Sequence, residues 1–143
     1  MNELFKLAAV AVLAMSATHA YAEVTISDAW ARATRPAQKV GAAYMTLKST
    51  QDAKLVKVDS PAAGTVEIHS MTMNDGVMKM RRLEELELSA GEPVKLAPGG
   101  FHLMLFDLAK PIKAGESVPF TLHFKDSAGN MSTVQTQAPV KAN

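Results

Sequence analysis

The sequence contains no cysteine among its 143 residues. A disulfide framework is therefore excluded, and the fold must be stabilised by an ordinary hydrophobic core. The lack of thiols also excludes a thiol redox centre, a cysteine nucleophile and a blue-copper electron-transfer site, because each of these needs a thiolate. Any metal site in this chain must use histidine, methionine or carboxylate ligands.

An excess of charge of one sign is also lacking. Lys and Arg number 15, Asp and Glu number 14, and the formal net charge is +1. The two signs are interleaved along the chain, so no basic surface for nucleic acid or for an anionic membrane is indicated. The length and the hydrophobic content of 48% suffice for one domain that buries its own core.

The sequence has no long apolar run. A short apolar run covers residues 7–15. Lys6 precedes this run, and the small-x-small pattern of residues 20–22 follows it. We predict a cleaved signal peptide over residues 1–22 and a mature β domain over residues 23–143. Because the run is too short to span a bilayer and no cysteine could carry a lipid, we expect an exported protein without a membrane anchor, free in the periplasm or secreted.

Helical periodicity over three turns is missing as well, and the chain after the signal is patterned as short β-strands. Turn residues separate these strands at short intervals, which is typical of a sandwich or small barrel. We therefore predict a single all-β domain. The predicted strands cover residues 24–31, 41–48, 55–58, 64–71, 77–82, 86–88, 94–96, 101–106, 118–124 and 131–140.

The sequence Asn-Asp-Gly at residues 74–76 is a strong hairpin turn signal. A two-residue loop formed by its first pair places His69 directly opposite Met80. A loop formed by its second pair places Met71 opposite Met80, with His69 on the diagonal. Both registers put these three side chains on one face, whereas a three-residue loop ending at the glycine would change the pairing.

The strand that begins near residue 101 carries a second pair of candidate ligands. Side chains alternate along a strand, so His102 and Met104 point to one side, and Phe101, Leu103 and Leu105 point to the other. We expect the apolar set to face the core and the imidazole and thioether to share the less buried face. We expect no carboxylate at chelating spacing beside the histidines, which argues against a metal-dependent hydrolase or oxidase.

Ligand softness indicates the metal. Thioethers bind hard cations poorly and imidazole is borderline, so a mixed histidine and methionine set favours Cu(I) over zinc or iron. Methionine has no proton to lose and neither residue forms disulfides, which suits a site that must hold copper in an oxidising compartment and then release it. The pattern therefore predicts a Cu(I)-binding protein.

The spacing of these residues resembles the signature of the periplasmic copper chaperones called PCu(A)C. His69 is followed after ten residues by Met80, then after twenty-one by His102 and after one by Met104. The resemblance implies a cupredoxin-like Greek-key β fold that is not an enzyme and binds one Cu(I) per chain through these four residues. Segments that carry the same likeness are residues 29–32, 43–45 and 98–105.

The resemblance also implies partners. Members of the family are associated with supplying copper to the CuA centre of cytochrome c oxidase, often alongside Sco-type thiol proteins. The alternatives are a periplasmic copper buffer or resistance protein and a metal-free β-sandwich interaction module. Residues 135–143 contain neither histidine nor methionine, so we expect no second Cu(II) site in the tail.

The sequence assigns no definite functional role to four further residues. Met71, Met73 and Met78 fit alternative copper ligands during transfer, a hydrophobic rim that docks a partner, or ordinary strand packing equally well. His123 has no neighbouring ligand in the sequence, so we interpret it as a surface or cross-strand residue.

Overall fold

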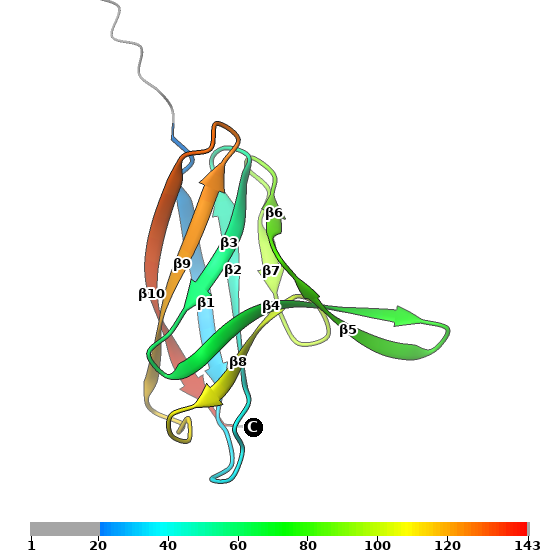
Figure 1. The fold of residues 1–143 in the computed structure, drawn as a ribbon, viewed down its shortest axis with the longest axis vertical. Helices are drawn as coiled ribbons and strands as arrows, with labels where there is room; N and C mark the ends of the chain where they lie inside the picture. The colour runs from blue at the N-terminus through cyan, green and yellow to red at the C-terminus, as the bar shows by residue number, and fades with distance from the viewer. Residues whose placement is uncertain (1–20, 143) are drawn as a thin grey trace, which may run out of the picture.

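The computed structural model describes residues 21–142, which form strands and turns (Figure 1). Ten strands occur where the sequence predicts ten, and the all-β prediction is confirmed. The predicted signal peptide lies almost wholly outside the described residues. In chain order the strands are β1 (Val24–Arg32), β2 (Gly41–Ser49), β3 (Ala53–Asp59), β4 (Ala63–Asn74), β5 (Val77–Leu83), β6 (Leu86–Leu88), β7 (Val94–Leu96), β8 (His102–Leu108), β9 (Ser117–Asp126) and β10 (Met131–Lys141).

The strands form the two layers of a sandwich. One layer has the order β5-β4-β8-β2-β1, with β7 also paired to β2, and the other has the order β10-β9-β3-β6. A short parallel contact between β1 and β10 joins the two layers at the pairs Ala31–Val140 and Arg32–Lys141. All other strand pairs in the described residues are antiparallel.

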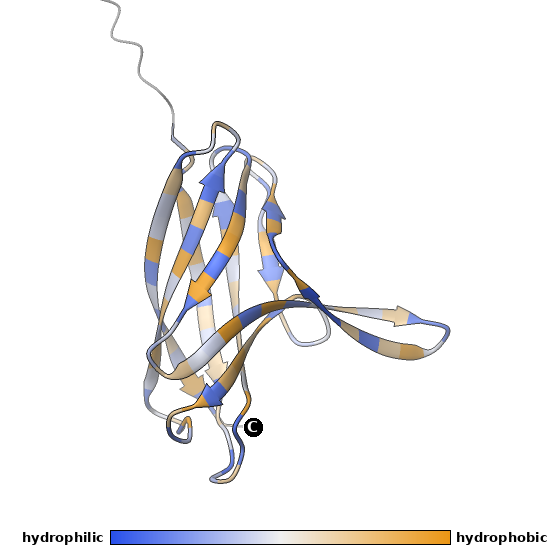
Figure 2. Cartoon of the chain, in the orientation of Figure 1, coloured by the Kyte–Doolittle hydropathy of each residue, from blue (hydrophilic) through white to orange (hydrophobic). Residues whose placement is uncertain are grey.

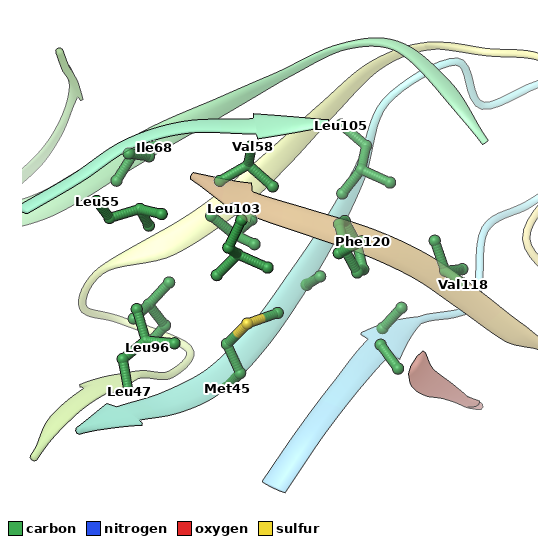
Figure 3. Packing of buried hydrophobic residues seen from close by; sticks show 14 of the residues in the cluster. Met45, Leu47, Leu55, Val58, Ile68, Leu96, Leu103, Leu105, Val118 and Phe120 are labelled. Atoms are coloured by element: carbon green, nitrogen blue, oxygen red, sulfur yellow. The ribbon is translucent and has the colours of Figure 1, made fainter. Parts of the chain in front are cut away.

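The core lies between the two layers and follows the period-two alternation of the sequence. Hydrophobic and hydrophilic residues alternate along the strands of the body (Figure 2), and the hydrophobic set points inward. Figure 3 shows this set meeting between the layers. The most deeply buried members, at most 1% exposed, include Met45, Leu47, Leu55, Leu103, Leu105, Phe120 and Leu122.

The end of the β4–β5 hairpin projects from the body (Figure 1). Strand β4 pairs with β8 as far as His69, and beyond that residue it pairs only with β5. We call residues 70–82 the arm. Its turn is formed by Asp75 and Gly76, which both have positive φ, at 51° and 78°. This two-residue turn selects the second predicted register, with Met71 opposite Met80.

The prediction that Phe101 faces the core is wrong. Phe101 is 36% exposed and precedes β8, which begins at His102. A tight turn causes this, because the Ala97 amide donates to the carbonyl of Phe101 at 2.9 Å and Gly99 adopts a left-handed φ of 86°. The turn takes Phe101 out of the alternation that buries Leu103 and Leu105.

Within residues 21–142, no helix has the length and hydropathy that a membrane crossing requires.

Candidate metal centre

The predicted ligands on β4 and β8 share the face of the sheet that points away from the core. The register pairs His69 with His102 and, one row further, Glu67 with Met104. The alternate residues of the same strands, Ile68 among them, belong to the core. Two strands far apart in the sequence thus bring two imidazoles, one thioether and one carboxylate together.

The two histidines are buried even though they lie on the outer face. His69 is 8% exposed and His102 is 4% exposed. Their ring centroids are 5.6 Å apart, and the ring of Phe106 lies 6.0 Å from that of His69. This face is less buried than the core face of β8, as expected, since Leu103 and Leu105 are 0% exposed and Met104 is half-buried, but the histidines themselves are largely shielded from solvent. Buried imidazoles need partners for their nitrogens.

His69 has a partner for only one of its ring nitrogens. Its Nε2 lies 2.7 Å from Glu67 Oε2, and the carboxylate can only accept, so Nε2 carries the proton. In the neutral ring Nδ1 then holds a lone pair. This Nδ1 atom is buried and has no hydrogen-bond partner. A buried acceptor without a partner costs free energy, and a metal ion is a partner that would remove this cost.

His102 is held in the opposite tautomer. Its Nδ1 lies 3.1 Å from the carbonyl oxygen of Gly100, which can only accept, so Nδ1–H donates and Nε2 keeps the lone pair. A metal–imidazole bond is about 2 Å long, so two rings whose centroids lie up to roughly 6 Å apart can bind one ion. The observed 5.6 Å falls within this limit. The residues present therefore fit a metal ion.

Glu67 is the residue that sequence reasoning missed. It precedes His69 by two residues, and a strand places such residues on the same face. Glu67 contacts His69 as a hydrogen-bond partner, so the expectation that no carboxylate chelates a metal with the histidines is not contradicted. The second oxygen of Glu67, Oε1, lies 3.6 Å from Arg82 Nε. Glu67 thus orients His69 and ties it to β5, as carboxylates commonly do for histidines that bind metals.

Nitrogen and oxygen donors do not complete a site by themselves. Histidine, aspartate and glutamate side chains form no group of three capable of holding a metal anywhere in residues 21–142. A metal at the paired histidines would therefore depend on sulfur. Met104, in the row next to His102 on β8, is the adjacent thioether.

Met80 is the predicted ligand that the structure does not bring to the others. It lies on the arm opposite Met71, whereas His69 lies opposite Arg82. Strand spacing of about 4.8 Å and a rise of about 3.4 Å per residue put the α-carbons of Met80 and Met104 roughly 17 Å apart in a flat sheet. Two methionine side chains cannot span that distance to one ion.

His123 lies in the other layer of the sandwich. Its Nε2 is 2.7 Å from Asp59 Oδ2, across the β9–β3 pair. It is therefore a cross-strand residue of the second sheet, well separated in the topology from the outer face of β4 and β8.

Fold and site together define a class: an all-β sandwich with a buried histidine pair and thioethers on the outer face of one sheet. Residues 24–140 match the family described as LpqE-like lipoproteins, and the chain belongs to this family. A protein named as a lipoprotein, Lxx21020 of Leifsonia xyli subsp. xyli, is 33% identical over 121 residues, which cover 82% of this chain and 69% of that protein.

Solved structures specify the family further. The copper-bound PCuAC domain from PmoF2 is 26% identical with a TM-score of 0.68, covering 87% of this chain and 97% of that one. The Cu(I) form of DR1885 from Deinococcus radiodurans is 35% identical with a TM-score of 0.63, covering 83% of this chain and 78% of that one. The predicted PCuAC relationship and the single-domain cupredoxin-like fold are confirmed.

Proposed function

We propose that this protein is an exported Cu(I) chaperone that carries copper through the periplasm as cargo and is not an enzyme. The similarity to copper-bound PCuAC domains supports copper as the metal. The donor set supports the Cu(I) state, because thioether and neutral imidazole are soft or borderline ligands without charge.

The orphaned Nδ1 of His69 is the observation that carries the proposal. Glu67 holds the proton on the other nitrogen of His69, and Gly100 does the same for His102. In its neutral form each ring therefore has one nitrogen that carries no proton and can bind a metal. These neutral rings need little reorganisation to bind Cu(I).

The proposed ligands are His69, His102 and Met104 at the base of the arm, with Met80 joining them. Recruitment of Met80 requires the arm to bend toward β8. Bending is feasible because the arm is a two-stranded ribbon without a third strand, and such ribbons are only marginally stable on their own. One Cu(I) per chain is then bound by two imidazoles and two thioethers.

The surroundings of the site favour a role in carrying copper over a role in catalysis. An acid or base in a hydrolytic metal site must be free to exchange a proton with substrate. Glu67 is committed to His69 at 2.7 Å and lies beside Arg82. Its position suits orientation of a ligand, which is what a copper carrier needs.

Delivery to the CuA centre of cytochrome c oxidase, with a Sco-type protein as a companion, is the destination that the family resemblance suggests. Export fits the lipoprotein description of the family and of its Leifsonia relative. Strand β1 begins at Val24, directly after the expected cleavage site, so removal of residues 1–22 would leave every strand intact.

An anaerobic competition titration against a coloured Cu(I) chelator tests the proposal. The wild-type protein should remove one tightly bound equivalent from the chelator, and His69→Ala and Met104→Leu should each weaken binding by at least about 100-fold. His123→Ala is the matched control and should compete like wild type. Equal losses in His123→Ala and His69→Ala, or no competition by wild type, would refute the copper-carrier function.

A further inference from the structure

The arm carries four methionine sulfur atoms, of which Met80 alone belongs to the copper site proposed above. Met71 lies opposite Met80, and Met73 lies opposite Met78. Directly opposed residues of an antiparallel pair share a face with β-carbons about 5 Å apart, and the next row of that face follows after about 7 Å. The four thioethers therefore form two adjacent rungs on one face of the ribbon.

Three of these thioethers are exposed to solvent, and Met71, nearest the body, is half-buried. The exposed fractions are 67% for Met73, 46% for Met78 and 47% for Met80. The other face of the arm is mainly polar, with Arg81 opposite Ser70 and Lys79 opposite Thr72. No residue of the arm belongs to the hydrophobic core, so core packing does not explain why the methionines are there.

Apolarity does not explain them either. Strands ordinarily use β-branched or aromatic residues at apolar positions, and none of these occupies the sulfur-bearing face of the arm. The chain has nine methionines, and four stand on this one small face. Among the methionines in residues 21–142, only Met45 is buried in the core. The property that the arm positions share is sulfur.

We infer that the arm is a second, all-thioether site for a soft monovalent cation, Cu(I) or its analogue Ag(I). Thioether sulfur is a soft, uncharged donor that selects Cu(I). Methionine has three rotatable bonds, which lets sulfurs from both rungs converge on one ion. The site binds less tightly than the histidine site because it is exposed and has no imidazole. It needs neither His69 nor His102, so it goes beyond the proposed function.

Met80 connects the two sites. In this structure it belongs to the arm, where it faces Met71, and bending of the arm would bring it toward the histidines. A cation on the arm would move with Met80 during that bend. The rung of Met73 and Met78, near the tip of the arm, is therefore the place where copper enters or leaves the protein.

The test follows Ag(I) binding by NMR in protein labelled with ¹³C at the methionine methyl groups. Wild type should take up two equivalents, and the second should shift the methyl signals of Met73 and Met78. Met73→Leu/Met78→Leu, which keeps the apolar volume and removes two sulfurs, should take up one equivalent. Met131→Leu, at a methionine that is 59% exposed on β10, is the matched control and should take up two.

A His69→Ala/His102→Ala variant separates this site from the histidine site. It should lose the tight equivalent and keep one that shifts the signals of Met73 and Met78. The inference is overturned if those signals move no more than that of Met131, or if Met73→Leu/Met78→Leu still takes up two equivalents. A wild-type protein that binds one ion at the histidines alone would retain the proposed function and eliminate the arm site.

Discussion

The body of the sandwich and the arm follow different rules. In the body, inward side chains such as Leu103 and Phe120 are at most 1% exposed, and burial of apolar surface explains each of them. In the arm, Met73 and Met78 are 67% and 46% exposed, although they alternate as regularly as the core residues do. The same period-two pattern thus accompanies close packing in one region and solvent-exposed thioethers in the other.

The histidine pair lies at the boundary between these regions. His69 is the last residue of β4 that pairs with β8, and residues beyond it belong to the arm. Glu67 and the Gly100 carbonyl orient the two imidazoles in the body, while Met80 stands on an arm that consists of two strands alone. A carrier needs both properties, because it must select its metal and then release it.

The largest effect expected is on the stability of the body. Phe120→Ala removes a ring that is 1% exposed and should lower the free energy of unfolding by about 3–5 kcal/mol. Met78→Leu on the arm should change it by less than about 0.5 kcal/mol. Urea denaturation measures both. A comparable loss in Met78→Leu would show that the arm is packed like the core and would remove the distinction.

The next effect is on stabilisation by copper. A ligand at 100 times its dissociation constant raises the free energy of unfolding by about 2.7 kcal/mol if only the folded state binds it. Cu(I) at that level should do so for wild type and for His123→Ala, and should not for His102→Ala. Thermal unfolding with and without Cu(I) under anaerobic conditions provides the comparison. Stabilisation of His102→Ala to the wild-type extent would place the metal elsewhere.

A smaller effect should follow from the carboxylate that orients His69. Glu67→Gln keeps the size of the side chain and removes its charge, so Cu(I) affinity should fall about tenfold, the low end for such partners of ligating histidines. Glu87→Gln, at an exposed residue of β6, is the control and should bind like wild type. Chelator competition resolves a tenfold change, and an unchanged affinity in Glu67→Gln would remove Glu67 from the site.

The smallest effect concerns the contact between Arg82 on the arm and Glu67. Arg82 is 65% exposed at its side chain and lies 3.6 Å from Glu67, and exposed ion pairs contribute little. Arg82→Ala should therefore weaken Cu(I) binding by no more than about threefold, and Arg81→Ala, on the opposite face, should have no effect. A loss as large as that of Glu67→Gln would mean that Arg82 is part of the machinery that positions His69.

Sequence reasoning predicted the strands well because alternation and turn residues are local signals. All ten strands were predicted within a few residues, and His102 and Met104 share a face as alternation requires. The register of the hairpin remained open among three alternatives, because the sequence at residues 74–76 allows either two-residue loop or a three-residue loop that ends at the glycine. Positive φ at Asp75 and Gly76 decides among them.

The features that the sequence did not predict depend on contacts between segments and on turns outside the alternating pattern. The pairing of β4 with β8, which opposes His69 and His102, has no signal within either strand. Phe101 was assigned to the core because the tight turn before β8 is invisible to a periodicity count. Glu67 was discoverable, since it stands two residues before His69, but carboxylates were sought as ligands and not as partners of a ligand.

X-ray absorption at the copper edge, on protein loaded with one equivalent of Cu(I), tests the central claim most directly. The account predicts both nitrogen and sulfur neighbours around copper, with sulfur scattering reduced in Met80→Leu/Met104→Leu and nitrogen scattering reduced in His69→Ala. A first shell made only of nitrogen and oxygen, or one unchanged in both variants, would contradict a mixed histidine and methionine site for Cu(I).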